Sequence, residues 1–178
     1  MKVLLHACCA DCALKFLQAI KADKSASSLT VCVYYYNPNI HPRAEYSARL
    51  KAMQQVCTEN KVKMIIPDWR PVEYFQKIRG DLERPNRCIK CWNLRLEATA
   101  KYAKENNFEA FASTLVTSEY QDQDKIEKIA LEKAKKYGVK FWQPKEVVKE
   151  LKTSGFYKQF FCGCVYSMKE RYEEKYGK

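Results

Sequence analysis

The sequence predicts an α/β domain with a mainly parallel sheet between two layers of helices. Short apolar runs, several rich in the β-branched and aromatic residues that suit buried strands, alternate along the chain with longer segments of helical spacing. Such alternation is typical of parallel sheets, in which a helix carries the chain back between neighbouring strands. We therefore expect a Rossmann-like three-layer fold. The 178 residues suffice for one domain, residues 1–178, with a sizeable core.

Five strands and five helices are expected, with two helices between the third and fourth strands. The strands are predicted at residues 3–5, 29–36, 63–66, 110–115 and 139–142, and the helices at 12–22, 46–60, 72–79, 92–106 and 122–137. Gly138 can close the last of these helices in the left-handed conformation. From about residue 145 the alternation breaks, and we expect a C-terminal helical appendage of two short helices that flank residues 154–164 and carry a cysteine pair.

Charge and composition limit the class of protein. Lys and Arg total 32 against 21 Asp and Glu, so the formal net charge is +11, which favours an anionic partner such as nucleic acid; a Lys-rich solvated surface is the alternative. No apolar run approaches the roughly 18 to 20 residues of a membrane-spanning helix, so we expect no membrane partner. The first residues lack the features of a secretory signal, and we expect a cytoplasmic protein.

Seven of the nine cysteines fall into three groups. The groups are Cys8, Cys9 and Cys12, then Cys88 and Cys91, then Cys162 and Cys164. In a reducing compartment, grouped thiols bind metal or do redox chemistry more often than they form disulfides. A two-residue spacer lets both thiolates of a pair reach one metal centre, and Gly163 permits the tight backbone that a cysteine pair one residue apart requires.

The first cysteine group is expected at an active site. It follows the first strand and precedes the first helix, and open α/β sheets bind ligands beyond the carboxyl ends of their strands. Seven thiolates exceed the four that one iron–sulfur cluster or one zinc ion needs. A second metal, with Asp11 as a candidate oxygen ligand, or a reversible dithiol would use the rest. Buried inert thiols and a structural zinc site are the alternatives, whereas Cys32 and Cys57 are expected in the core.

Polar and aromatic residues are predicted near the cysteines. The loop after the second strand offers Tyr36, Asn37 and Asn39 for stacking or hydrogen bonding to a nucleotide, and His41 as a metal ligand or proton donor. Core tyrosines and a hydrogen-bonded structural histidine are the alternatives there. Positive charge beside the second cysteine pair comes from Arg87, Lys90 and Arg95, although a solvated helix face explains Lys90 equally well. Polar side chains after the fourth strand include Ser118 and Gln121, and helix capping is the alternative role for Ser118.

Taken together, five segments resemble the QueH family of cobalamin-independent epoxyqueuosine reductases. They are HACCADC at 6–12, YNPNIHP at 36–42, Glu45-Tyr46 with Arg49, RCIKC at 87–91 with Arg95-Leu96, and QFFCGC at 159–164. The match spans nearly the whole chain in the family's order. At Asp11 the chain departs from the family, whose members often have proline there, so no role is transferred to this position.

The resemblance implies a two-electron removal of the epoxide oxygen from epoxyqueuosine at the wobble position of tRNA with a GUN anticodon. It implies a 4Fe-4S cluster, a second metal ion taken to be iron, and an electron donor that the sequence does not identify. It also implies substrate contacts from Arg49, Arg95 and Gln159. As a hypothesis, the second metal acts as a Lewis acid, the cluster delivers electrons, and Asp11 or His41 protonates the leaving oxygen.

Two other functions compete with this hypothesis. A tRNA sulfur-transfer enzyme would share the α/β fold, cysteine pairs and basic surface, but it normally needs ATP. No Gly-rich phosphate loop follows the first strand, which counts against it. A non-catalytic zinc module that binds RNA is the other alternative.

Overall fold

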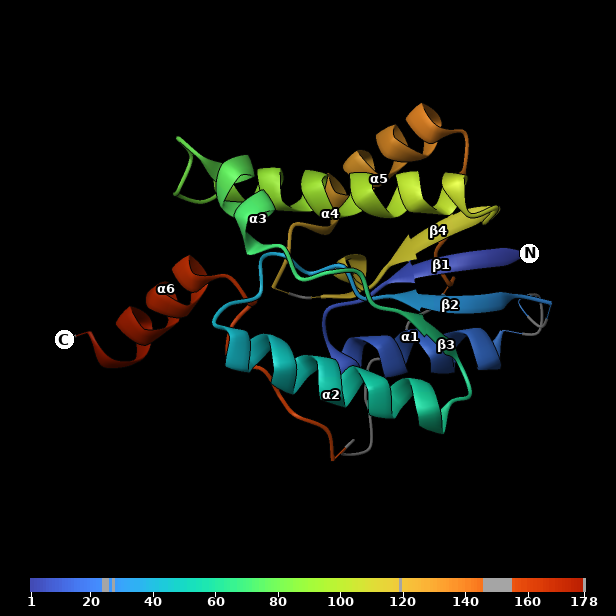
Figure 1. Cartoon of the computed structure of the whole chain (residues 1–178), viewed down its shortest axis with the longest axis horizontal. Helices are drawn as coiled ribbons and strands as arrows, with labels where there is room; N and C mark the ends of the chain where they lie inside the picture. The colour runs from blue at the N-terminus through green and yellow to red at the C-terminus, as the bar shows by residue number, and fades with distance from the viewer. Residues whose placement is uncertain (24–25, 27, 119, 146–154, 178) are drawn as a thin grey trace.

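The predicted α/β fold class is confirmed by a computed structural model, which describes residues 1–23, 26, 28–118, 120–145 and 155–177. Within these residues, five parallel strands form one sheet in the order β3-β2-β1-β4-β5 (Figure 1). The strands are β1 (Lys2–His6), β2 (Thr30–Tyr34), β3 (Lys63–Ile65), β4 (Ala110–Ser113) and β5 (Lys140–Phe141). β1 is central, and its side chains from Val3 to Leu5 are fully buried, as expected for a strand covered on both faces.

Helices cover both faces of the sheet and complete a three-layer sandwich (Figure 1). The layers contain α1 (Ala10–Ala22) and α2 (Arg43–Glu59) on one face, and α4 (Asn86–Glu105) and α5 (Gln123–Tyr137) on the other. Successive β1 side chains point to opposite faces: Val3 and Leu5 pack in the α1/α2 core, and Leu4 packs in the α4/α5 core. α3 (Pro71–Ile78) packs against α4.

The chain changes direction in the sheet between β1 and β4. β2 pairs with one side of β1 and β4 with the other, so the connections that leave these two strands run to opposite sides. This switch point leaves a crevice at the carboxyl ends of the strands, where open α/β sheets bind their ligands. Beyond β4 the backbone continues as the 3-10 helix η2 (Thr114–Thr117), so the predicted strand 110–115 is too long at its end.

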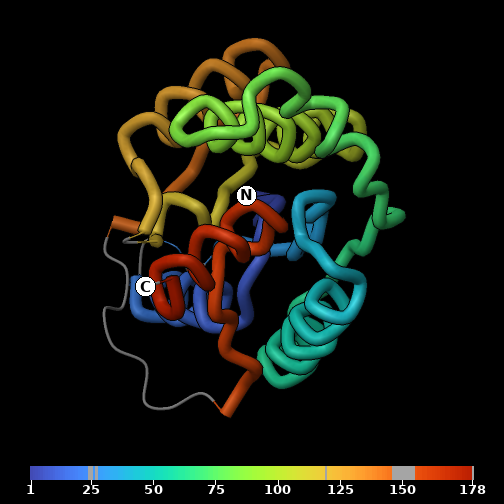
Figure 2. The backbone as a smooth tube through the Cα atoms, turned by 90° about the vertical axis from the view of Figure 1, so that its left-hand side faces the viewer, coloured from blue at the N-terminus to red at the C-terminus, as the bar shows by residue number. Residues whose placement is uncertain are grey.

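The C-terminal helix α6 (Val165–Tyr176) crosses this edge of the sheet. Figure 2 shows α6 in front of the sheet, between the α4/α5 layer and the α1/α2 layer. It is the second of the two helices predicted for the appendage; the first falls mostly on residues 146–154 and lies outside the described residues. No helix among the described residues is both long enough and apolar enough to cross a membrane.

Two helices begin three or more residues earlier than the sequence pattern predicted. α2 begins at Arg43 rather than at residue 46, and α4 begins at Asn86 rather than at residue 92. Both helices follow a proline, Pro42 or Pro85, at the N-cap. Proline is tolerated there because the first turn has no intrahelical use for its missing N–H. The second cysteine pair therefore lies in a helix.

We expect Phe111→Ala in β4 to lower the free energy of unfolding by about 3 to 5 kcal/mol. The ring is fully buried between β1, β5 and α4, and its removal loses apolar burial and leaves a cavity. Urea unfolding followed by circular dichroism measures the change. Leu131→Ala is the control: Leu131 is exposed on α5, so its loss should cost less than about 0.5 kcal/mol. Equal effects of the two substitutions would contradict the assigned core.

Candidate functional site

One cavity at the carboxyl edge of the sheet collects all three cysteine groups. It has a volume of about 370 Å³, and Cys8, Cys9, Cys12, Cys88, Cys91, Cys162 and Cys164 all contribute to its wall. By contrast, Cys32 and Cys57 are buried in the two cores and do not line it, as predicted. Segments more than 150 residues apart in the chain thus meet around one space.

The first cysteine group surrounds the N-terminus of α1. Cys9 is the N-cap, and its Sγ accepts a hydrogen bond from the backbone N–H of Cys12 at 3.1 Å. The sulfur atoms of Cys9 and Cys12 lie 2.7 Å apart. This contact lowers the pKa of Cys9 to about 7, against the effect of burial, and together with burial it raises the pKa of Cys12. One anionic sulfur is therefore stabilised at the helix terminus.

The second group lies in the first two turns of α4. Cys88 and Cys91 are three residues apart in a helix, so their side chains lie on neighbouring positions of one face. Because the predicted helix began only at residue 92, this helical placement of the pair was not predicted. Burial raises the pKa of Cys91 to about 12, and the neighbouring Arg95 guanidinium opposes that rise.

The third group precedes α6, and Gly163 determines its shape. Gly163 has φ of +127°, and a Cβ there would lie 3.0 Å from Ile40 Cγ1 and 3.3 Å from Asn39 Nδ2. Its carbonyl accepts a hydrogen bond from the His41 backbone N–H at 2.8 Å. The contact with Cys162 lowers the pKa of Cys164 to about 5. The predicted need for glycine between these cysteines is confirmed by the positive φ and the close approach.

Arg95 links the first two cysteine groups from the inside of the protein. Its guanidinium is buried, donates from Nη2 to Asn37 Oδ1 at 3.0 Å, and lies with Nε 3.3 Å from His6 Nε2. It forms no ion pair with a carboxylate among the described residues. Interactions with the sulfurs of Cys8 and Cys91 instead raise its pKa against the effect of burial. A buried cation needs hydrogen-bond partners or negative charge around it, and the nearest sulfur atoms come from both cysteine groups.

His6 is a structural residue of this network. Its Nδ1 lies 2.9 Å from Ser113 Oγ at the end of β4, and its Nε2 lies 3.2 Å from the carbonyl oxygen of Tyr36. Burial and the adjacent Arg95 charge hold its pKa well below the usual value, so the imidazole is neutral. The ring connects the ends of β1 and β4 at the base of the cavity.

Arg49 and Glu45 hold the segment that carries the third cysteine group. Arg49 Nε donates to Glu45 Oε1 at 2.6 Å, while its Nη2 and Nη1 donate to the carbonyls of Phe161 and Cys162 at 2.8 and 3.3 Å. Tyr157 donates to the other Glu45 oxygen at 2.5 Å. Arg49 lines the cavity but is almost entirely buried, so the structure gives it a positioning role; the predicted substrate contact stays a prediction.

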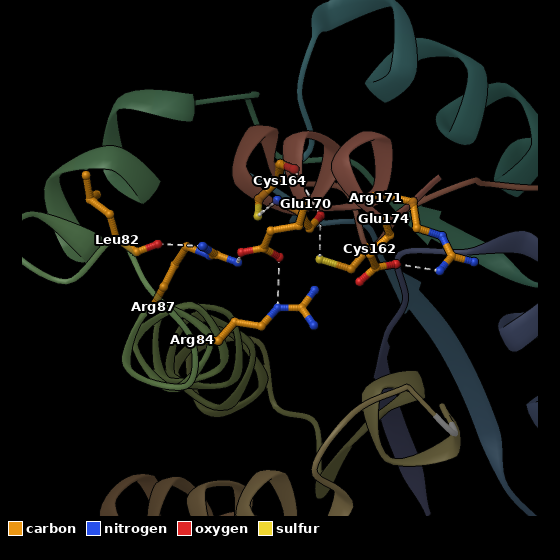
Figure 3. Close-up of polar contacts among 9 residues, drawn as sticks. Leu82, Arg84, Arg87, Cys162, Cys164, Glu170, Arg171 and Glu174 are labelled. Atoms are coloured by element: carbon orange, nitrogen blue, oxygen red, sulfur yellow. Dashed lines mark hydrogen bonds and ion pairs between the residues drawn. The ribbon is translucent and has the colours of Figure 1, made fainter. Parts of the chain in front are cut away.

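A second set of ion pairs holds α6 over the cavity (Figure 3). The buried Arg87 donates from Nη2 to Glu170 Oε1 at 2.6 Å, and Arg84 Nε lies 3.0 Å from Glu170 Oε2. Arg87 also donates to the Leu82 carbonyl and lies over the Tyr166 ring at 5.3 Å. Glu170 is thus the main polar link between α6 and the α4 layer.

Of the other predicted site residues, some line the cavity and some do not. Asn39, Arg95, Ser118, Gln121 and Gln159 line it, whereas Asp11, Tyr36, Asn37 and His41 are not part of its wall. Asn37 instead donates to the Ala7 carbonyl at 2.9 Å, and Tyr36 donates to Glu73. His41 packs against Tyr74 and Phe75. The catalytic roles predicted for Asp11 and His41 stay predictions.

Some cavity residues escaped the sequence analysis, among them Tyr74 on α3, which faces Cys164 and contributes to lowering its pKa. Thr114, in the polar run that the sequence places after the fourth strand, has a buried hydroxyl without a hydrogen-bond partner among the described residues. Asn39 Oδ1 is likewise buried and unpartnered. Unpaired buried polar atoms in a cavity wall are costly unless a ligand or water satisfies them. Arg84 also lines the cavity. It is the one missed residue that the sequence could have pointed to, because it stands next to a proline and four residues before Cys88.

Comparison with known proteins identifies a family. A family profile for the epoxyqueuosine reductase QueH matches residues 3–170. The proteins of that name from Dehalococcoides mccartyi and Histophilus somni are 35% and 34% identical to this chain, over 96% and 95% of it and over 94% and 73% of their own lengths. The Thermotoga maritima protein of that name is 31% identical over 97% of this chain and 93% of its own.

We expect Glu170→Gln to loosen α6 and to raise amide hydrogen exchange in residues 165–176 about tenfold. The substitution leaves the buried Arg87 guanidinium without its carboxylate, and a hydrogen bond to a charged group contributes about 1.5 kcal/mol or more. Exchange detected by mass spectrometry measures the change. Glu173→Gln is the control, because the ion pair that Glu173 forms within the described part of the chain is with the exposed Lys169 on the same helix. Equal exchange in both variants would show that other contacts hold α6.

Proposed function

The chain belongs to the QueH family of epoxyqueuosine reductases, and from that premise we propose that it reduces epoxyqueuosine in tRNA to queuosine. The reaction takes up two electrons and two protons, breaks both carbon–oxygen bonds of the epoxide, leaves a carbon–carbon double bond and releases the oxygen as water. One observation carries the proposal: seven cysteines from three separate groups line one cavity in a member of this family.

We propose that these cysteines hold a 4Fe-4S cluster and an adjacent iron ion. Among the described residues, no three Cys, His, Asp or Glu side chains converge closely enough to hold a single ion as they stand. A multi-iron cluster is larger than one ion and is bound at separate corners, so its ligands surround a space. When bound, such a group supplies electrons singly and provides a Lewis acid.

The charge balance of the cavity supports anionic sulfur ligands. Arg95 lies buried between Cys8 and Cys91, and Arg87 has Cys88 and Cys164 near it in addition to Glu170. Metal-bound cysteines are thiolates, and each guanidinium offsets part of the negative charge that several thiolates bring into a buried site. A set of inert, protonated thiols would leave Arg95 as an uncompensated buried cation.

The remaining polar wall suits a substrate that is rich in hydrogen-bonding groups. The Thr114 hydroxyl and Asn39 Oδ1 are unpaired at the cavity, and Ser118, Gln121 and Gln159 lie along it. We propose that these groups orient the modified base so that its epoxide faces the cysteines. The hydroxyls of Thr114 and Tyr74 are candidate donors for the protons that the leaving oxygen takes up, beside Asp11 and His41.

The activity test uses protein purified without oxygen, a low-potential chemical reductant and an anticodon stem-loop RNA that contains epoxyqueuosine. Mass spectrometry of the digested RNA should show a nucleoside lighter by one oxygen atom. ATP-dependent gain of sulfur by the RNA would favour the sulfur-transfer alternative. Colourless protein that contains zinc and leaves the epoxide intact would favour the RNA-binding zinc module.

We expect Cys12→Ser, Cys91→Ser and Cys164→Ser each to lower epoxide reduction by about 100-fold or more and to lower the iron bound per chain. Each removes a thiolate from a different cysteine group of the cavity wall. Iron and acid-labile sulfide analysis, together with the RNA assay, measures both effects. Cys32→Ala and Cys57→Ala are the controls, because both thiols lie outside the cavity and should leave iron content unchanged. Full iron content in all three serine variants would remove the basis of the proposal.

We expect Arg95→Gln to weaken iron retention by about tenfold or more, because it removes the cation that balances Cys8 and Cys91. Arg95→Lys keeps the charge but not the planar geometry, so its iron retention should lie between those of Arg95→Gln and the unchanged protein. Competition with an iron chelator, followed by visible absorption, measures retention. Iron retention that is the same in all three proteins would exclude charge balance by Arg95.

A further inference from the structure

Three exposed aromatic rings form a continuous row at the C-terminal helix. Phe160, Tyr172 and Tyr176, here called the aromatic ladder, are 40%, 51% and 64% exposed. The Phe160 and Tyr172 ring centroids lie 5.7 Å apart, and those of Tyr172 and Tyr176 lie 5.9 Å apart with an interplanar angle of 24°. Single exposed aromatic side chains are common, but a contiguous exposed set marks a surface that interacts.

Two cations lie against this ladder. The Arg171 guanidinium lies 5.5 Å from the Phe160 ring centroid, and Lys175 Nζ lies 5.2 Å from the centroids of both Phe160 and Tyr176. Arg171 also pairs with Glu174 at 2.8 Å, whereas Lys175 forms no ion pair among the described residues. The surface therefore combines aromatic faces with positive charge, the combination that single-stranded nucleic acid binds.

The ladder continues the wall of the cysteine cavity outward. Phe160 and Arg171 line that cavity, and so does Tyr120, which is 88% exposed on the segment after η2. Within α6, only Ser167 is buried, so the core does not require Tyr172 or Tyr176. An RNA whose wobble base reaches the cysteines has to place its neighbouring nucleotides at this mouth.

We propose that the aromatic ladder stacks unpaired nucleotides that flank the reacting base of the tRNA anticodon loop. This inference rests on the proposed function, which makes tRNA the substrate. Unpaired loop bases are splayed out and offer planar faces to aromatic side chains, and their phosphates match Arg171 and Lys175. Stacking is tolerant of sequence, so the ladder would serve tRNAs that differ beside the wobble position.

The test measures binding of a fluorescent anticodon stem-loop RNA that lacks the epoxide, and of the same RNA with abasic residues on both sides of the wobble base. Tyr172→Leu should bind the intact loop about tenfold more weakly than the unchanged protein does, because one base loses its stacking partner. Tyr172→Phe keeps the ring and should bind like the unchanged protein. With the abasic loop, all three proteins should bind with similar affinity.

Equal affinity of Tyr172→Leu and the unchanged protein for the intact loop would overturn the inference and leave the ladder as a packing device of α6. So would an unchanged protein that binds intact and abasic loops equally. Reduction of the epoxide by the unchanged protein is measured separately. If the epoxide is reduced but Tyr172→Leu binds the intact loop as well as the unchanged protein does, only the role of the aromatic ladder is contradicted. If Tyr172→Leu binds more weakly but the unchanged protein does not reduce the epoxide, only the proposed function is contradicted.

Discussion

The site is organised around Arg95, a buried guanidinium that has no carboxylate partner among the described residues. Arg95 projects from α4 beneath the cavity, where it reaches the ends of β1 and β2 through His6 and Asn37 and two cysteine groups through Cys8 and Cys91. A buried charge is costly unless hydrogen bonds and opposite charge surround it. The same contacts that satisfy Arg95 therefore connect the first cysteine group, at the end of β1, to the second group on α4.

The topology of the sheet explains why distant segments can supply one site. β1 lies at the centre, and the chain leaves its carboxyl end toward α1, while β4 leaves in the opposite direction through η2. The crevice between these two exits is wide enough to receive side chains from α3, α4 and the C-terminal segment. The cysteines therefore lie at the switch point of the sheet, where the connections after β1 and β4 diverge.

Much of the site could be predicted from sequence, because spacing and glycine carry local information. The cysteine groups and the need for Gly163 depend on neighbouring residues, and so does the order of strands and helices. The predicted start of α4 was wrong: the helix begins at Asn86, directly after Pro85, and includes both cysteines of the second group. Whether Asp11 and His41 face the cavity depends on the direction of their side chains. Sequence periodicity does not determine that direction in segments this short. The Arg87–Glu170 pair joins residues 83 apart and leaves no local trace.

The hydrogen bonds from Arg49 to the carbonyls of Phe161 and Cys162 join residues 112 and 113 positions apart. Closing so long a loop costs conformational entropy, which the contacts of the C-terminal segment have to offset. The five cysteines of the first two groups lie on the α/β core, whereas Cys162 and Cys164 reach the cavity only through that segment. Its contacts with Arg49 therefore decide whether seven sulfurs or five surround the cavity.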